Sequence, residues 1–76
     1  MTCEIVLKST SDIKNLNDAA FGYDGKITVS SGRFYIDARS ILSLFALVGK
    51  KVNLVFPDHE RPEKINKLLK KIDYLF

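Results

Sequence analysis

The most constraining feature of this 76-residue sequence is a pair of alternating segments joined at a glycine. Residues 26–30 and 33–37 place apolar side chains at every second position, which is the pattern of a strand with one buried face. Ser31-Gly32 between the two segments is a tight-turn signal. The segments therefore predict a β-hairpin.

The remaining periodicities predict two more strands and three helices. Strands are expected at 3–8 and 51–56, where apolar and polar residues alternate, and helices at 11–21, at 40–48 and from about 62 almost to the end. The order is βαββαβα. It predicts an α+β fold, an open-faced sandwich in which three helices cover one face of a four-stranded, largely antiparallel sheet. We expect a single domain over residues 1–76.

The same periodicities predict which side chains form the core. The stripe on the last helix continues through Leu75 and Phe76. The predicted core consists of Ile5, Leu7, Ile27, Val29, Phe34, Ile36, Leu44, Leu47, Val52, Leu54, Leu68, Leu69 and Ile72.

Composition excludes several classes of protein. Apolar residues make up 46% and charged residues 28% of the chain, as in ordinary globular domains, which argues against disorder. The single cysteine, Cys3, cannot form an internal disulfide and fits a reducing cytoplasm. One cysteine and one histidine cannot build a structural zinc site, so we expect neither metal nor cofactor. Acidic Glu4 in a strand-like N-terminus argues against a signal peptide, and the longest apolar run, 44–48, is too short to span a bilayer.

The net charge of +3 arises entirely from residues 50–76, which hold seven basic and four acidic residues. Most of the excess forms a stripe on the last helix: Lys64, Lys67, Lys70 and Lys71. We interpret this stripe as a solvated face with Glu60–Lys64 and Glu63–Lys67 pairs at i, i+4. A weak nucleic-acid-binding module is the alternative, disfavoured because few aromatic side chains accompany the lysines.

The segment after Ser40 has more apolar side chains than one buried face can use. We expect the Ser40 hydroxyl to cap a helix that Gly49 ends. At 3.6 residues per turn its apolar residues point in nearly all directions, so some must be exposed as a patch. The apolar residues are Ile41, Leu42, Leu44, Phe45, Leu47 and Val48.

One stretch resembles a known family. Residues 26–47, and above all Ser31-Gly32-Arg33-Phe34 with Asp37-Ala38-Arg39-Ser40-Ile41, are similar to HPr, the histidine-containing phosphocarrier protein of the bacterial sugar phosphotransferase system. The likeness covers the whole chain in element order and is specific over 27–56. It implies the HPr fold, with no cofactor.

The resemblance does not extend to the phosphocarrier site. In HPr the phosphoryl group is carried by a histidine just after the first strand. That place reads Lys8-Ser9-Thr10-Ser11-Asp12-Ile13 here, without a histidine. His59 follows the last strand, where the family has no phosphoryl acceptor. The resemblance therefore implies the fold without the carrier activity.

The resemblance also implies an interaction site. Ser40 matches the regulatory serine that a dedicated kinase phosphorylates in many Gram-positive bacteria, and the family equivalents of Ile41, Leu42 and Phe45 face outward and bind partner proteins. With Arg39 beside Ser40, these residues form the predicted partner-binding site. Candidate partners are a phosphotransferase-system enzyme, a serine kinase, a transcription regulator or a second copy of the chain.

We therefore hypothesise a non-enzymatic, cytoplasmic interaction or regulatory protein. The acidic residues of the first half form no catalytic constellation, and no nucleophile–base pair is visible. A ferredoxin-like small-ligand regulatory domain, which shares the βαββαβ order, is the alternative fold. His59 with Asp58 and Glu60 is a weaker candidate for a metal or acid–base site, and Ser9 to Ser11 for an anion site.

Overall fold

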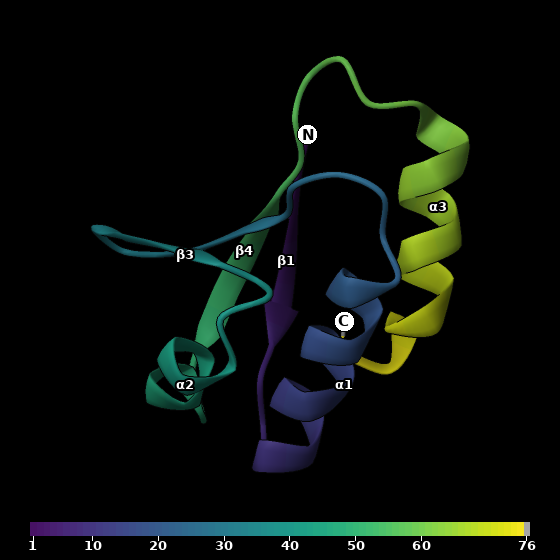
Figure 1. The fold of residues 1–76 in the computed structure, drawn as a ribbon. Helices are drawn as coiled ribbons and strands as arrows, with labels where there is room; N and C mark the ends of the chain where they lie inside the picture. The colour runs from purple at the N-terminus through teal and green to yellow at the C-terminus, as the bar shows by residue number, and fades with distance from the viewer. Residues whose placement is uncertain (76) are drawn as a thin grey trace.

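The computed structural model describes residues 1–75, without the side chain of Tyr74, and its elements follow the predicted order (Figure 1). Phe76, predicted to extend the stripe on the last helix, lies outside the described residues. The elements are β1 (Thr2–Val6), α1 (Thr10–Phe21), β2 (Thr28–Ser31), β3 (Phe34–Asp37), α2 (Ile41–Leu44), the 3₁₀ turn η1 (Phe45–Leu47), β4 (Lys51–Val55), α3 (Pro62–Lys71) and the 3₁₀ turn η2 (Asp73–Leu75).

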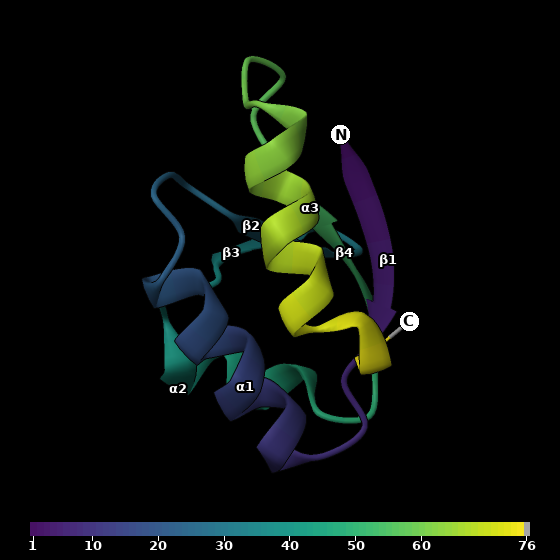
Figure 2. The ribbon, with the colours of Figure 1, turned by 90° about the vertical axis from the view of Figure 1, so that its right-hand side faces the viewer.

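The four strands form one antiparallel sheet in the order β1-β4-β2-β3. Val29 lies opposite Leu54 on β4 and Ile36 on β3, so apolar side chains align across the middle of the sheet. Helices α1 and α3 pack on one face (Figure 2), and α2 and η1 add Leu44 and Leu47 to the same core. The fold is therefore the predicted α+β open-faced sandwich.

The β2–β3 hairpin turns through Gly32 and Arg33, one residue later than Ser31-Gly32 predicts. Ser31 pairs with Phe34 across the turn, and Gly32 has a φ of 59° whereas Arg33 has a negative φ. Those angles match a type II′ turn, whose first central position favours glycine.

Burial agrees with most of the predicted core. The wrong position is Phe34, which is 70% exposed because the tip of the hairpin projects away from α1 and α3 (Figure 1). Ile36 and Leu69 are half-buried against the core. The predicted list also omits several residues that are buried: Ile13, Leu16, Ala19, Ala20, Tyr23, Ala38, Phe56, Ile65 and Leu75.

The helix predicted over 40–48 is one α-helical turn, α2, continued by η1. After η1 the Gly49 N–H donates to the carbonyl of Leu7 at 2.6 Å, and the Leu7 N–H donates to the carbonyl of Lys50 at 3.1 Å. These bonds bring the end of η1 beside the connection from β1 to α1. No helix within residues 1–75 has the length and apolar character needed to cross a bilayer.

Candidate functional site

An apolar surface lies on α2 and η1, where the sequence predicts one. Leu42 is 82% exposed, Val48 39% and Phe45 37%, and we call these three residues the α2–η1 patch. Leu44 and Leu47 of the same segment are fully or almost fully buried. The segment therefore buries one side only, and the remaining apolar side chains reach solvent.

Ile41 departs from the prediction that it is substantially exposed. Its side chain is half-buried and packs against the hydrophobic core. In a single α-helical turn, Ile41 lies three residues before Leu44 and shares its inward-facing side. The exposed part of the predicted site is thus smaller and is centred on Leu42.

Ser40 precedes α2 but does not cap it, which contradicts the predicted hydrogen bond to the backbone. Its hydroxyl makes no bond to a backbone N–H of α2 and lies 3.1 Å from the hydroxyl of Ser43. The side chain is exposed. Because α2 has only one turn, its dipole supplies little of the anion stabilisation that a longer helix offers.

Arg39, predicted to bind a partner, holds the segment between α1 and β2. Its Nη2 donates to the carbonyls of Tyr23 and Gly25 at 3.1 and 3.3 Å, and its Nε donates to that of Ala20 at 3.5 Å. Two of these carbonyls, those of Ala20 and Tyr23, also accept backbone N–H bonds from Tyr23 and Gly25, so Arg39 reinforces a turn that the backbone already closes. The guanidinium therefore already has intramolecular partners.

The start of α1 is the place where the resemblance to HPr predicts the phosphocarrier site. Ser9 is the N-cap, and its hydroxyl accepts from the N–H of Asp12 at 3.4 Å. The Asp12 carboxylate accepts in return from the N–H of Lys8 at 2.9 Å. These two bonds satisfy backbone N–H groups at the start of α1, one within the first turn and one just before the N-cap, so Ser9 and Asp12 have a structural function.

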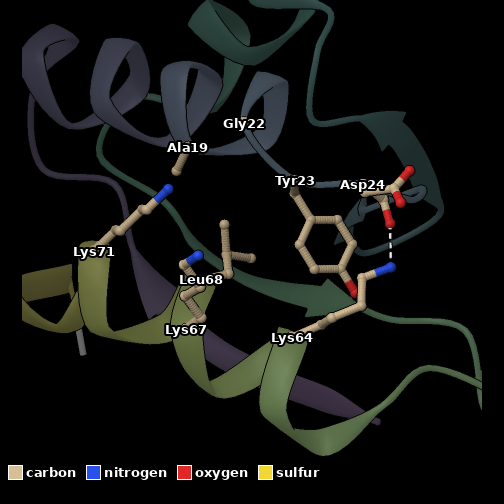
Figure 3. Close-up of a pocket in the computed structure, with 8 residues that line it drawn as sticks. All are labelled: Ala19, Gly22, Tyr23, Asp24, Lys64, Lys67, Leu68 and Lys71. Carbon is tan, nitrogen blue, oxygen red and sulfur yellow. Dashed lines mark hydrogen bonds between the residues drawn. The ribbon is translucent and has the colours of Figure 1, made fainter.

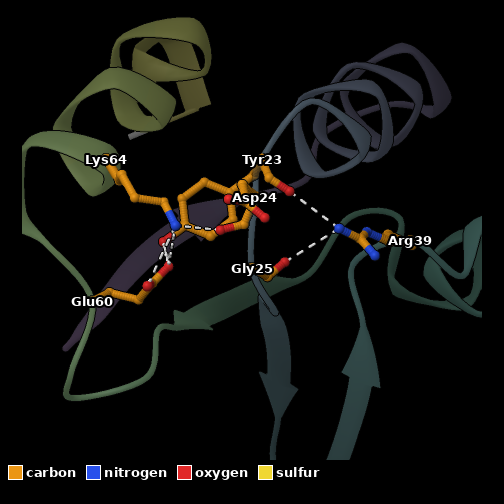
Figure 4. A network of polar contacts seen from close by, with 6 residues as sticks. All are labelled: Tyr23, Asp24, Gly25, Arg39, Glu60 and Lys64. Atoms are coloured by element: carbon orange, nitrogen blue, oxygen red, sulfur yellow. Dashed lines mark hydrogen bonds and ion pairs between the residues drawn. The ribbon is translucent and has the colours of Figure 1, made fainter.

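Residues from two distant parts of the chain meet at the other end of α1 (Figure 4), and we call Tyr23, Glu60 and Lys64 the polar clasp. The Tyr23 hydroxyl donates to the Glu60 carboxylate, which lies 3.3 Å from Lys64 Nζ. Lys64 also donates to the carbonyl of Asp24 and stands 5.1 Å from the centre of the Tyr23 ring. Lys64 is thus half-buried, not on a solvated face as predicted, although its predicted pairing with Glu60 is confirmed.

The electrostatics of the polar clasp follow from this geometry. Burial, reinforced by the hydrogen bond to Glu60, raises the pKa of Tyr23 to about 12. The hydrogen bond from Tyr23, with the charge of Lys64, lowers the pKa of Glu60. Gly25 lets the backbone before β2 lie close to both Glu60 and Tyr23. A Cβ at this position would lie 2.7 Å from a Glu60 carboxylate oxygen and 2.9 Å from the Tyr23 ring.

A hollow of about 180 Å³ lies beside the polar clasp, between the end of α1 and α3 (Figure 3). Ala19, Leu68 and Tyr23 supply apolar walls, and the side chains of Lys67 and Lys71 point toward it. The lysine stripe therefore divides: Lys64 belongs to the polar clasp, Lys67 and Lys71 border the hollow, and Lys70 is exposed.

The remaining candidates do not assemble into a site. His59 is exposed, while Glu60 beside it turns toward Tyr23 and Lys64. Within the described part of the chain, no three histidine, cysteine, aspartate or glutamate residues are grouped so as to hold a metal ion. Sequence reasoning predicted the Glu60–Lys64 pair but missed Tyr23, because Tyr23 and Glu60 are 37 positions apart and no local pattern joins them.

Comparison with known proteins identifies the fold. A search of solved structures matches the whole chain to 94% of a protein described as HPr-C-His from Thermoanaerobacter tengcongensis, with a TM-score of 0.73 and 20% sequence identity. No family model matches the chain, and no curated protein matches it. The fold is thus that of HPr, as predicted, and the ferredoxin-like alternative is not supported.

Proposed function

We propose that the chain is a non-enzymatic, HPr-like interaction protein of the phosphotransferase system that binds a partner protein through the α2–η1 patch. The observation that carries this proposal is the 82% exposure of Leu42 on a segment whose neighbours Leu44 and Leu47 are buried. A contiguous apolar surface on a small protein marks an interaction site when nothing within the chain covers it.

The proposal excludes a phosphocarrier function at the start of α1. Residues 9–12 contain serine, threonine and aspartate side chains and no imidazole. A phosphoserine or phosphothreonine is a stable ester, whereas transfer to a further acceptor uses a phosphorylated imidazole nitrogen. Ser9 and Asp12 are engaged in side-chain bonds to backbone N–H groups at the start of α1, in keeping with a structural function.

Incubation with the general phosphotransferase enzyme and labelled phosphoenolpyruvate tests this part of the proposal. We expect no acid-labile label on the protein. Acid-labile label that disappears in a His59→Ala variant would contradict it, because it would identify His59 as an acceptor.

Ser40 is the candidate point of regulation, at the border of the α2–η1 patch. Its exposed hydroxyl has no backbone bond to lose on modification. A phosphate there adds nearly two negative charges beside Leu42. We expect phosphorylation to strengthen binding to a basic partner surface and to weaken binding to an acidic one.

Binding is best tested with purified candidates, namely the general phosphotransferase enzyme and an HPr serine kinase, titrated into the isotopically labelled chain. We expect chemical-shift changes concentrated at Leu42, Phe45 and Val48. Leu42→Ser should abolish them, whereas Lys14→Glu on exposed α1 should not. Binding that leaves these three residues unperturbed, or that survives Leu42→Ser, would contradict the proposed site.

A further inference from the structure

The two edges of the sheet are strands β1 and β3, and neither pairs with another described segment on its outer side. Unpaired edges attract other strands, and proteins usually block them with charges. At β3 the exposed side chains include two large aromatic residues, Phe34 at 70% and Tyr35 at 73%. This edge is therefore unusually suited to pairing.

The backbone of β3 is arranged for such a pairing. Ser31 and Phe34 flank the two-residue turn, so they exchange hydrogen bonds, and the bonding alternates from there along the hairpin. The N–H of Ala38 donates to the carbonyl of Ile27 at 3.0 Å, which fits this alternation. The N–H groups of even-numbered residues thus face β2, and those of Tyr35 and Asp37 face the open edge.

The sequence of the edge is complementary to itself. When two copies pair antiparallel with Tyr35 opposite Tyr35, Arg33 falls opposite Asp37 and Phe34 opposite Ile36. Alternation places Phe34 and Ile36 on the face that carries the helices and Tyr35 and Asp37 on the open face, and Arg33 is the turn residue that directly precedes β3. Each charge then meets its opposite, and two exposed or half-buried apolar side chains cover one another.

The other edge lacks this complementarity. Antiparallel pairing of two β1 strands over Thr2–Val6 places Glu4 opposite Glu4 at its centre. Two like charges directly opposite each other destabilise a strand pair. Self-association by strand pairing is thus favoured at β3 and opposed at β1.

We propose that two copies of this chain associate through their β3 strands, with the two-fold axis at Tyr35, to form one continuous eight-stranded antiparallel sheet. The Tyr35 N–H of each copy donates to the Tyr35 carbonyl of the other, and Arg33 pairs with Asp37 across both ends. The residues used differ from those of the α2–η1 patch, so this inference stands independently of the proposed function.

Charge exchange tests the pairing. A contact between two strands this short belongs to the weak, transient class, so sedimentation equilibrium is run up to millimolar protein with a reductant. Each of the variants Arg33→Glu and Asp37→Lys places like charges opposite each other twice, and we expect either to weaken self-association about tenfold or more. An equimolar mixture of the two variants restores the opposite-charge pairs and should associate as wild type does. Lys14→Glu serves as the control for net charge, and Leu42→Ser for the α2–η1 patch.

Amide hydrogen exchange locates the contact within the same chain. The amides of Tyr35 and Asp37 should exchange more slowly as the concentration rises, while those of Phe34 and Ile36, already bonded to β2, should change little. A chain that stays monomeric at every concentration overturns the proposal. So does a dimer that tolerates Arg33→Glu, or one that Leu42→Ser abolishes, because the second copy would then bind elsewhere.

Discussion

The α2–η1 patch and the polar clasp reverse the usual relation between residue type and burial. In the α2–η1 patch, leucine, phenylalanine and valine side chains reach solvent. In the polar clasp, a tyrosine, a glutamate and a lysine are buried or half-buried. The difference teaches that the burial of a side chain here depends on how many segments surround it, more than on its polarity.

The number of neighbouring segments differs sharply between the two regions. The α2–η1 segment touches the rest of the protein on one side, so two of its apolar side chains, Leu44 and Leu47, fill that contact. The polar clasp brings together the end of α1, the connection after β4 and the first turn of α3 (Figure 4). Buried polar atoms are tolerated there because each has a hydrogen-bond partner.

The largest loss of stability should come from truncating a side chain on the buried side of the α2–η1 segment. Leu44→Ala removes a fully buried side chain and should lower the free energy of unfolding by about 2–5 kcal/mol. Leu42→Ala, two residues away and exposed, should change it by less than about 0.5 kcal/mol. Urea denaturation of both variants measures the contrast. Equal losses would mean that Leu42 is packed.

A smaller loss of stability is expected from a substitution in the polar clasp. Tyr23→Phe keeps the ring and its edge-on contact with Phe56 but removes the hydroxyl that donates to Glu60. One such hydrogen bond contributes about 1 kcal/mol, so the melting temperature should fall by about 4–8 °C. Tyr35→Phe, on the exposed face of the hairpin, is the matched control. A melting temperature unaffected by Tyr23→Phe would show that the hydroxyl contributes nothing.

The polar clasp should also make stability depend on pH at both extremes. The pKa of Tyr23 is raised to about 12 in the folded state, so its contribution is complete below pH 10 and is lost as the pH rises toward 12. The pKa of Glu60 is lowered, so its contribution is present above its ordinary value of 4.5 and is lost as the pH falls through the lowered pKa.

Denaturation of wild type and of Tyr23→Phe across the pH range measures both effects. The advantage of the wild type should shrink from pH 10 to 12. A constant difference over that interval would contradict the assignment of the raised pKa to Tyr23.

The smallest change in stability is expected at Ser40, beside the α2–η1 patch, in contrast to Ser9 at the start of α1. Ser9→Ala removes a side-chain cap and should cost about 1 kcal/mol. Ser40→Ala removes no bond to the backbone and should change stability by less than about 0.5 kcal/mol. Comparable losses in thermal denaturation would show that Ser40 caps α2 after all.

Much of this fold could be predicted because its elements are patterned locally. The hairpin, the strands β1 and β4, and the helices α1 and α3 each carry a period that one buried face imposes, and each lies within a few residues of its predicted position. The α2–η1 patch was predictable because it, too, follows from the residues of one short segment. Too many apolar residues in one short segment indicated an exposed surface, and Leu42 is indeed exposed.

What the sequence determined by itself is the order of the strands and helices along the chain, the inward-facing side of each element and the self-complementary pattern at Arg33 to Asp37. What only the tertiary structure decided is where each side of an element meets another part of the chain. Phe34 follows the inward alternation but lies beyond the helices, whereas Lys64 follows the outward pattern but lies over Tyr23. Periodicity assigns a side chain to a face of its own element, whereas burial requires a second surface, which comes from residues tens of positions away.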